Sequence, residues 1–365
     1  MRGPRSDMTS VRPDWAETCR STVEQLEIHP VPTRPTMDET RYTIRDFVDS
    51  DYPAFADLHK AVDPSFPVSP ESLRHRYETL RLVSGPLPRF VVSDRHTNEV
   101  VGVGGLVRHA HENDAVHPWI YGEVLPARQR QGIGSYLYRV LLAEALRRGA
   151  QGLRCTVEEN SAAGRTFLAK RAFVERRRTW QSRLEVAAAE TSELEGLIQG
   201  LSHEGVEFTS LAREGANDPL VLHRIHDLDI DSGRDVPRVG AYTPISFEVF
   251  RRFLAEDENV VPEAWLLAKA GNRYIGMSSA GREPAKPGIL QQYFTGTRAE
   301  YRRKKVALTL KMLLVQFARE NGYVGIETFN DASNAPMWML NQRLGFRKLR
   351  ELIQVECDLR GMTPD

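Results

Sequence analysis

Residues 128–173 read RQRQGIGSYLYRVLLAEALRRGAQGLRCTVEENSAAGRTFLAKRAF, and residues 301–346 read YRRKKVALTLKMLLVQFARENGYVGIETFNDASNAPMWMLNQRLGF. The two segments superpose at an offset of 173 residues. The coinciding positions are Leu137 with Leu310, Leu141 with Leu314, Ala145 with Ala318, Gly149 with Gly322, and Phe173 with Phe346. Each copy predicts a loop, a long amphipathic helix, a strand, a short helix and a basic turn. The sequence therefore predicts one α+β unit used twice.

Strand-like runs precede each copy of this repeat. They are RYTIRDF (41–47), RFVVSD (89–94), EVVGVGGLVRH (99–109) and WIYGEVL (119–125) in the first half, and VEFTSLARE (206–214), EAWLLAKAGNRYIGMSSAG (263–281) and ILQQYFTGT (289–297) in the second. The start of the chain is rich in Pro, Thr and charge, which is typical of a tail or an arm. The predicted division is an arm or tail (1–40), a first domain (41–187), a linker (188–203) and a second domain (204–365).

The composition excludes several classes of protein. The 365 residues include 49 basic and 49 acidic side chains, and the mean hydropathy is −0.42. This balance argues against nucleic-acid binding, and no apolar run is long enough to cross a membrane. The first fifteen residues lack the apolar core of a secretory signal, so we expect a cytoplasmic protein. The cysteines Cys19, Cys155 and Cys357 form neither a disulfide framework nor a zinc pattern.

A glycine-bearing turn between a strand and a helix carries the strongest chemical signal. Its residues are Gln129, Arg130, Gln131, Gly132, Ile133 and Gly134. Such a turn gathers backbone N–H groups at the positive end of a helix dipole, which suits a phosphate or pyrophosphate. A Walker loop requires Gly-Lys-Ser/Thr, and a dinucleotide fingerprint requires a third glycine where Leu137 stands. The alternative is a glycine turn that only caps an ordinary helix.

The context of this turn resembles the GNAT acyltransferase superfamily. The resembling features are Val124-Leu-Pro126, the Gln-x-x-Gly-x-Gly turn, Asn160 and Arg171-Ala-Phe173. The resemblance implies a three-layer α/β/α fold with mixed, mostly antiparallel sheets, and an acetyl-CoA cosubstrate without a metal. It implies that the cosubstrate contacts Val124, Gln129, Arg130, Gln131, Gly132, Ile133, Gly134, Ser135 and Asn160. The backbone amides of the turn would hold the pyrophosphate.

The second half is similar to that of tandem-GNAT proteins. The similar features are Asp235-Val-Pro237, Thr295-Gly-Thr297, Lys311, Thr328-Phe-Asn330, Asn334, Met337, Asn341 and Leu344-Gly-Phe346. Lys305 replaces Gly132 there, and its side chain should hinder a close approach to the backbone. We therefore expect the first half to be the acyl-CoA site and the second a degenerate copy that shapes the acceptor pocket. The alternatives are a transferase site in the second half, or a non-catalytic acyl-CoA sensor.

The expected reaction is direct attack of an amine on the acetyl-CoA thioester, which needs a base and a stabilised oxyanion. The family resemblance assigns the oxyanion to the backbone N–H of Val124. Glu123 is the candidate base; the alternative is a carboxylate that faces solvent or pairs with an arginine. The resemblance also implies that a tyrosine acts as the general acid. In this chain its position is held by Phe167 or Leu168 in the first half and by Asn341 in the second. Glu158 and Glu159 are a further candidate pair, or helix-end charges.

The remaining polar clusters favour simpler interpretations. His109, His111 and His117 lack an accompanying Cys or carboxylate triad, so we expect a loop cluster and no metal site. The arginines near 147–178 are expected to form a solvated basic face. The acceptor is an amine of a small molecule or peptide that the sequence does not identify. Because the chain already pairs two copies of one unit, we expect a monomer rather than a homodimer.

Overall fold

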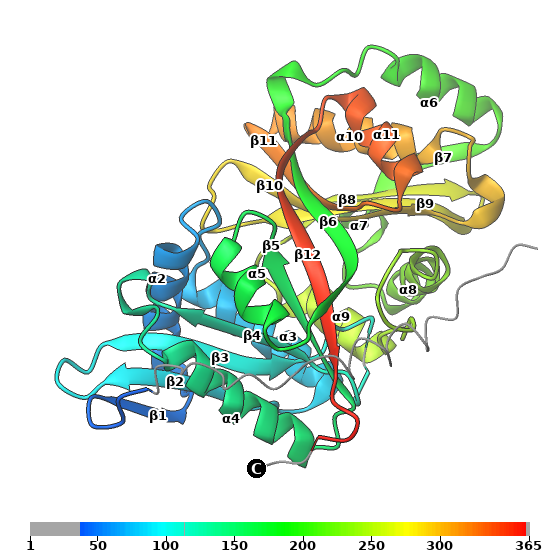
Figure 1. Ribbon diagram of the computed structural model, residues 1–365. Helices are drawn as coiled ribbons and strands as arrows, with labels where there is room; N and C mark the ends of the chain where they lie inside the picture. Colours follow the sequence, from blue (N-terminus) through cyan, green and yellow to red (C-terminus); the bar gives the residue numbers. More distant parts are fainter. Residues whose placement is uncertain (1–36, 113, 363–365) are drawn as a thin grey trace, which may run out of the picture.

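The computed structural model describes residues 37–112 and 114–362. Its strands join in one continuous twelve-stranded sheet (Figure 1). The strands of the first half are β1 (Tyr42–Asp46), β2 (Arg89–Asp94), β3 (Val100–Val107), β4 (Trp119–Val124), β5 (Gly152–Glu158) and β6 (Val174–Glu185). Those of the second half are β7 (Val206–Ser210), β8 (Val260–Ala270), β9 (Arg273–Arg282), β10 (Ile289–Thr297), β11 (Gly325–Asp331) and β12 (Arg347–Asp358).

The strand order is β1-β2-β3-β4-β5-β12-β6-β11-β10-β9-β8-β7. The pairs β4–β5 and β10–β11 are parallel, and all other neighbouring pairs in the described sheet are antiparallel. The predicted mixed, mostly antiparallel sheet is therefore confirmed.

Helices cover both faces of this sheet. In the first half they are α2 (Tyr52–Val62), α3 (Pro70–Ser84), α4 (Ile133–Arg147) and α5 (Ala162–Ala169). In the second half they are α6 (Leu194–His203), α7 (Leu211–Glu214), α8 (Pro219–Gly233), α9 (Phe247–Glu256), α10 (Val306–Glu320) and α11 (Ala335–Leu344). Short 3₁₀ turns lie at Asp49–Asp51, Pro126–Arg128, Val186–Ala188 and Ala299–Tyr301.

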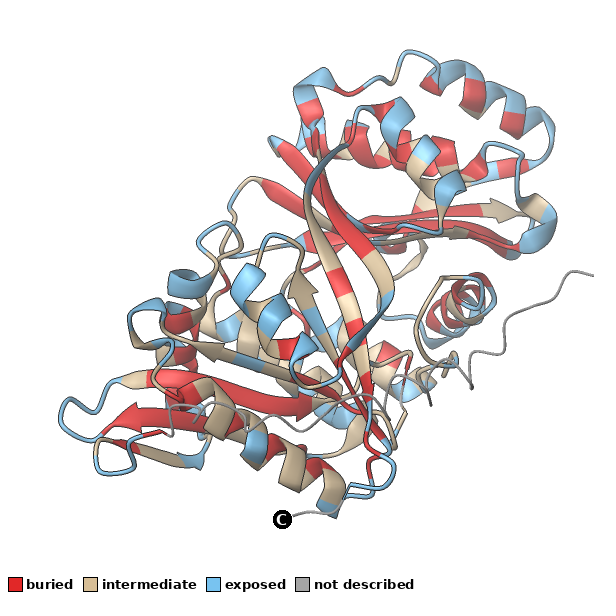
Figure 2. Cartoon of the chain, viewed as in Figure 1, coloured by how far each residue is buried: buried red, intermediate tan, exposed pale blue. Residues whose placement is uncertain are grey.

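The alternation of side chains along the strands creates the three layers. On β2, Val91 belongs to the apolar cluster beneath α2, whereas its neighbour Val92 belongs to the cluster beneath α4. Helical spacing in α4 predicts that five apolar residues face the core. Ile133, Leu137, Leu141 and Ala145 are buried, whereas the fifth, Val140, is only half-buried (Figure 2). The strands are thus buried on both faces, and the predicted α/β/α architecture is confirmed.

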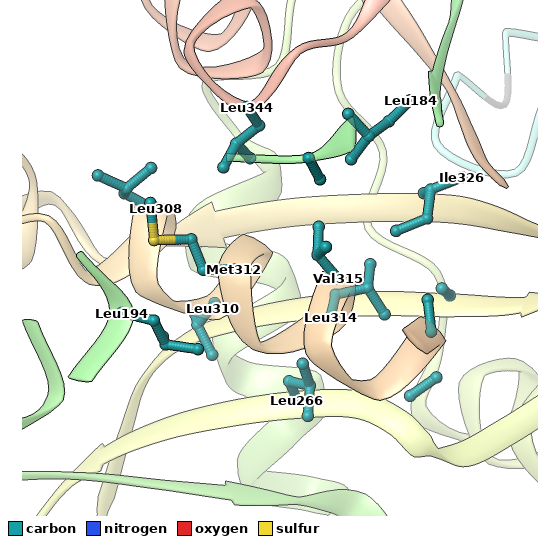
Figure 3. Packing of buried hydrophobic residues seen from close by; sticks show 14 of the residues in the cluster. Leu184, Leu194, Leu266, Leu308, Leu310, Met312, Leu314, Val315, Ile326 and Leu344 are labelled. Atoms are coloured by element: carbon teal, nitrogen blue, oxygen red, sulfur yellow. The ribbon is translucent and has the colours of Figure 1, made fainter. Parts of the chain in front are cut away.

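The two halves exchange their last strands. Strand β12 of the second half lies between β5 and β6 of the first, and β6 pairs in turn with β11 of the second. Leu184 on β6 therefore packs in the core of the second half, against residues of α10 and against Leu344 (Figure 3). Ile353 and Val355 on β12 belong to the core of the first half. Each core is completed by a strand from the other half.

The structure adds detail to the predicted division of the chain. The expected linker 188–203 contains α6, whose Leu194, Leu197 and Leu201 pack on the second core. Residues 1–36 of the expected arm lie outside the described residues. We keep the ranges 41–187 and 204–365 as a proposal for the two repeat units. None of the described helices is long and apolar enough to span a membrane.

Candidate active site

The parallel strands β4 and β5 part soon after they meet. Their one paired position within the described sheet is Trp119 with Arg154, where Arg154 N–H donates to Pro118 O at 3.0 Å. Beyond it, β4 follows β3 as far as Val124, whereas β5 follows β12. We call this separation the first splay. The second half has a corresponding second splay, because β10 and β11 pair only from Ile289 to Gln291.

The backbone of Val124 faces the first splay. Val124 stands opposite Gly102 on β3, and the adjacent Leu125 N–H donates to Val101 O at 2.9 Å. Antiparallel residues alternate between positions that exchange hydrogen bonds and positions that do not, so Val124 is a non-bonded position. Its N–H and C=O therefore point away from β3, toward the side from which β5 has separated. This is the orientation that an oxyanion donor at this residue requires.

The turn after β4 has an unusual backbone. Arg130 and Gly132 both have positive φ angles, of 65° and 83°, and Gly132 is the N-cap of α4 without a side-chain cap. The first N–H groups of α4 are thus left for another acceptor. Gln129 Nε2 donates to Val124 O at 3.1 Å, and Tyr42 Oη donates to Gln131 Oε1 at 2.5 Å. The side chains of the two glutamines therefore brace the turn, and no side chain caps the first N–H groups of α4.

Arg171 links this turn to α5. Its guanidinium donates to Ser135 Oγ at 3.0 Å and to Phe167 O at 2.8 Å. It also lies over the rings of Phe167 and Tyr138, at 3.5 and 4.8 Å. Arg171 is expected from the sequence to belong to the family pattern and to a basic face, and in the structure its guanidinium lies beside the first turn of α4.

The structure distinguishes the two candidate positions for the family's tyrosine. Ser161 caps α5, as Asn334 caps α11. Phe173 N–H donates to Leu168 O, as Phe346 N–H donates to Asn341 O. Leu168 is therefore the counterpart of Asn341 and is buried in the core. Neither residue carries a hydroxyl group.

Two further residues border the first splay. Phe167 lies over the turn, because a Cβ on Gly134 would lie 3.8 Å from its ring. Asn160 is exposed beyond the end of β5.

Glu123 forms an ion pair with His59 on α2, which the sequence analysis missed. Its Oε1 lies 2.7 Å from His59 Nδ1, and His59 Nε2 lies 3.0 Å from Phe66 O. Burial by itself would lower the pKa of His59, but the hydrogen bond and the charge of Glu123 outweigh burial and raise it. Glu123 Oε2 is buried without a partner among the described residues. The expected alternatives for Glu123, solvent or an arginine, are both wrong.

The second splay has the same turn but a different lining. Arg303 and Lys305 have φ angles of 60° and 63°, so Lys305 adopts the left-handed conformation of Gly132. Gly296 occupies the position of Glu123, so this part of β10 carries no carboxylate. Lys311 on α10 is 3% exposed and donates to Gln292 Oε1. Burial lowers the pKa of Lys311 to about 7.

Each of the three loop histidines has a different partner. His109 meets the edge of the Trp119 ring, with ring centroids 4.6 Å apart, and His111 stacks on Tyr242 at 5.9 Å. His117 Nδ1 lies 2.9 Å from Asp114 Oδ2. Within residues 37–112 and 114–362, no three His, Cys, Asp or Glu side chains come together to hold a metal ion.

Sequence comparison assigns the class of protein. The profile of the Acetyltransferase (GNAT) family matches residues 53–173 and again 224–346, which together make up more than half of the chain. The chain therefore belongs to this family, as a tandem of two such units.

The mycothiol acetyltransferase of Pseudarthrobacter chlorophenolicus is 26% identical over 234 residues, which are 62% of this chain and 65% of that protein. The match thus spans less than two thirds of the relative's length.

Solved structures share the whole tandem fold. A GCN5-related N-acetyltransferase from Sphaerobacter thermophilus has a TM-score of 0.65 at 17% identity, covering 89% of this chain and 98% of that one. A tandem GNAT protein from the clavulanic acid biosynthesis pathway has a TM-score of 0.66 at 16% identity, covering 88% and 100%. At these identities the likeness establishes the fold alone.

Proposed function

We propose that the first half transfers an acetyl group from acetyl-CoA to an amine of a small molecule or a peptide. The observation that carries this proposal is the first splay, with the Val124 N–H directed toward it and an uncapped helix turn at its end. Acetyl-CoA would supply the activated thioester carbonyl. The rest of the chemistry falls to residues of this chain, and the tandem arrangement favours a monomer.

The turn would hold the pyrophosphate of acetyl-CoA through the backbone N–H groups of residues Gln131 to Ser135. Positive φ angles at Arg130 and Gly132 turn successive amides toward one side, and the α4 dipole adds a partial positive charge. Arg171, bonded to Ser135, contributes a full charge at the same helix end. The Val124 N–H would stabilise the oxyanion as charge develops on the attacked carbonyl.

The Glu123–His59 pair is the proposed base. It lies one residue before the proposed oxyanion donor, on the same strand, with side chains about one-fifth exposed. Once His59 has lost its proton, the pair can accept a proton from an ammonium acceptor, directly or through one water. Attack by a neutral amine requires that deprotonation. Because the pKa of His59 is raised, the pair gains its activity as the pH rises above about 6.5.

Neither Phe167 nor Leu168 provides the family's tyrosine, so the proton for the departing thiolate is proposed to come from water. Tyr138 on α4 does not replace that tyrosine, because its hydroxyl is bonded to the thiol of Cys357 in the first core.

A second candidate function is acyl-CoA binding in the second half. Asn341 is 1% exposed, and neither polar atom of its amide has a hydrogen-bond partner among the described residues. An unsatisfied buried amide is costly, and a ligand in the second splay would relieve it. Since Gly296 replaces the glutamate there, this candidate is binding without transfer.

Release of free CoA thiol tests the transferase directly. Wild type is assayed with acetyl-CoA and a panel of amines, beside Glu123→Gln and a control, Glu207→Gln, whose side chain is 70% exposed on β7. We expect acceptor-dependent release that Glu123→Gln lowers about 10²-fold or more in kcat/KM and Glu207→Gln leaves unchanged. Tight acetyl-CoA binding without acceptor-dependent release would instead identify a non-catalytic acyl-CoA sensor.

A further inference from the structure

A cavity of about 360 Å³ lies between the two halves, apart from the first splay. The lining residues are Arg176, Arg177, Arg178, Pro237, Arg238, Val239, Asp331, Ala332 and Ser333. They come from β6 of the first half, from the α8–α9 loop and from the end of β11. Four arginines thus face one aspartate, and we call this cavity the arginine pocket. Its size suits a small organic molecule.

A β-bulge directs consecutive arginines of β6 toward this pocket. Arg177 pairs with Gln354 on β12, whereas Glu175 pairs with the next residue, Val355, so Arg176 is the extra residue of the bulge. Consecutive strand residues ordinarily point to opposite faces, and a bulge re-aims a side chain locally. The guanidinium of Arg176 is half exposed and lies 3.4 Å from Glu356. Its remaining N–H donors are open to a ligand.

Arg238 on the α8–α9 loop is a desolvated cation. It donates to Gly233 O at 2.9 Å and to Arg234 O at 3.4 Å, and it lies 4.5 Å from the centre of the Tyr242 ring. Within the described part of the chain, no carboxylate forms an ion pair with it. Burial lowers its pKa, and two backbone carbonyls and the Tyr242 ring, rather than a carboxylate, lie against its charge.

Two carboxylates act on Arg238 from a distance without forming an ion pair with it. Glu112 and Asp229 both attract it, but burial raises the pKa of each, that of Asp229 to about 6. Asp331, inside the pocket, is already bonded to Arg177 and to the Ser333 hydroxyl. Asp331 is therefore engaged elsewhere, and Arg238 is the pocket arginine that no described carboxylate pairs with.

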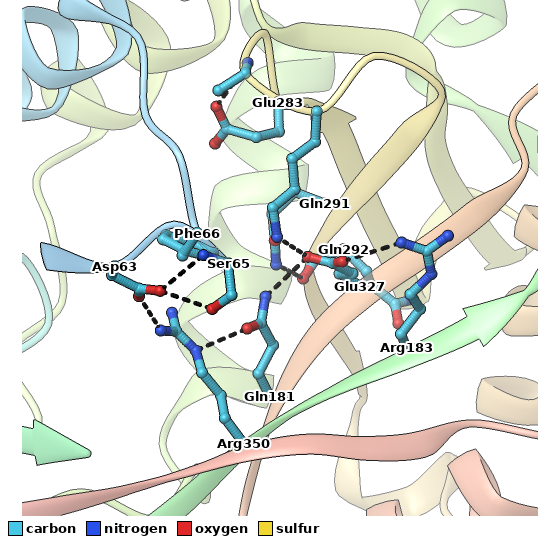
Figure 4. Close-up of polar contacts among 12 residues, drawn as sticks. Asp63, Ser65, Phe66, Gln181, Arg183, Glu283, Gln291, Gln292, Glu327 and Arg350 are labelled. Carbon is cyan, nitrogen blue, oxygen red and sulfur yellow. Dashed lines mark hydrogen bonds and ion pairs between the residues drawn. The ribbon is translucent and has the colours of Figure 1, made fainter. Parts of the chain in front are cut away.

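The equivalent place beside the first splay contains fewer arginines and more carboxylates. The counterparts of Arg176, Arg177, Arg178 and Asp331, 173 residues away, are Leu349, Arg350, Glu351 and Glu158. There Arg350 is bonded to Asp63 and Gln181, and its guanidinium lies 4.5 Å from the centre of the Phe66 ring (Figure 4). Arg350 is also bonded to Glu158. One arginine is neutralised by two carboxylates and covered by a ring. Between the same strands in the other half, Arg176, Arg177 and Arg178 are each ion-paired with a carboxylate. Arg238, on the facing loop, has no ion-pair partner among the described residues.

We propose that the arginine pocket binds a small molecule that carries carboxylate or phosphate groups. Guanidinium groups recognise both through paired N–H donors. Arg238 on one wall and Arg176 with Arg177 on the other can engage two such groups of one ligand. The proposal concerns binding only and does not rest on acetyl transfer in the first half.

Calorimetric titration of the full chain with pyrophosphate, inorganic phosphate and citrate, at constant ionic strength, tests this proposal. The variants are Arg238→Gln and Arg176→Gln. The control is Arg251→Gln, which removes an arginine that is paired with Glu248 on the exposed face of α9. A second control, Gly134→Glu, blocks the proposed pyrophosphate turn on α4 and leaves the pocket intact. Thermal melts establish that each variant is folded.

We expect saturable binding of at least one polyanion at a site that Arg238→Gln weakens tenfold or more and Arg176→Gln weakens several-fold. Arg251→Gln and Gly134→Glu should leave this binding within twofold of wild type. The preference for citrate or pyrophosphate identifies the carboxylate or the phosphate as the natural group. Absence of saturable binding, or binding that Gly134→Glu abolishes and Arg238→Gln preserves, would overturn the proposal.

Discussion

Thr179 on β6 pairs with Leu352 on β12, which is its own counterpart 173 residues later in the repeat. An antiparallel pair between equivalent positions marks a pseudo-twofold axis through the centre of the sheet. Around that axis, β12 fills the gap between β5 and β6, and β6 fills the gap between β12 and β11. The duplicated chain therefore builds internally what two identical chains would build as a symmetric dimer.

The first prediction concerns the first half alone. In a truncated chain of residues 37–190, β5 loses its neighbour β12, and β6 loses both of its neighbours, β12 and β11. Thr179 pairs with its own counterpart in the repeat, so β6 of a second copy can take the place of β12 beside it. We expect a dimer by light scattering.

A proline at Trp180 is the control for this prediction. Trp180 pairs with Asn330 on one side and with Glu351 on the other, and proline removes a ladder donor. The variant Trp180→Pro should abolish the dimer. A folded, stable monomer of the unmodified truncated chain would contradict the exchange of equivalent strands.

The second prediction concerns the pKa of His59. Its raised pKa depends on Glu123, since burial alone acts in the opposite direction. In wild type, an NMR titration should give a pKa above 6.5 for this imidazole, and Glu123→Gln should bring it below 6.5. Glu207→Gln should leave it unchanged. An unaltered pKa in Glu123→Gln would show that the ion pair does not control this histidine.

The third prediction concerns acid stability. Burial lowers the pKa of His111, which stacks on Tyr242, to about 4. In the unfolded chain the imidazole of His111 takes up a proton near pH 6.5, whereas in the folded chain it does so only near pH 4. Acid therefore favours the unfolded state, and the stability that this group contributes above pH 6.5 is lost as the pH falls. Between pH 7.5 and 5.5 this histidine accounts for a loss of about 1 kcal/mol in the free energy of unfolding.

His111→Phe keeps a ring against Tyr242 but does not titrate. Urea denaturation at the two pH values should therefore show a smaller acid loss for this variant than for wild type. An equal loss in both proteins would mean that other groups account for the acid sensitivity.

The repeat and its offset of 173 residues could be predicted from the sequence, because apolar residues recur in it at regular intervals. Leu137, Leu141 and Ala145 recur at a fixed offset, and all three lie in the core as the helical spacing predicts. The strand exchange was not accessible in this way. The apolar pattern of β12 predicts a buried strand but does not say which half buries it, since both cores have the same composition.

The candidate site was predictable only where it consists of backbone. The turn from Gln129 to Gly134 could be recognised because glycine spacing reflects φ angles and helix ends. His59 was missed because its contact with Glu123 joins residues 64 positions apart, and no local spacing encodes such a contact. Arg238 was missed for the same reason: its missing counter-ion is evident only once the α8–α9 loop is placed against β6.

The central claim, that the first half is the acetyl-CoA site, is tested most directly by calorimetric titration of acetyl-CoA into wild type, Gly134→Glu and Ala307→Glu. The two substitutions add the same carboxylate at equivalent positions, in the first turns of α4 and α10. A Cβ on Gly134 meets only ordinary contacts, at 3.7 Å from Val124 and 3.8 Å from Phe167, so the fold should tolerate it.

We predict that Gly134→Glu weakens acetyl-CoA binding at least tenfold, because the carboxylate repels the pyrophosphate from the turn, and that Ala307→Glu leaves the tight site within twofold of wild type. Unchanged binding in Gly134→Glu together with lost binding in Ala307→Glu would contradict the account and place the site in the second half.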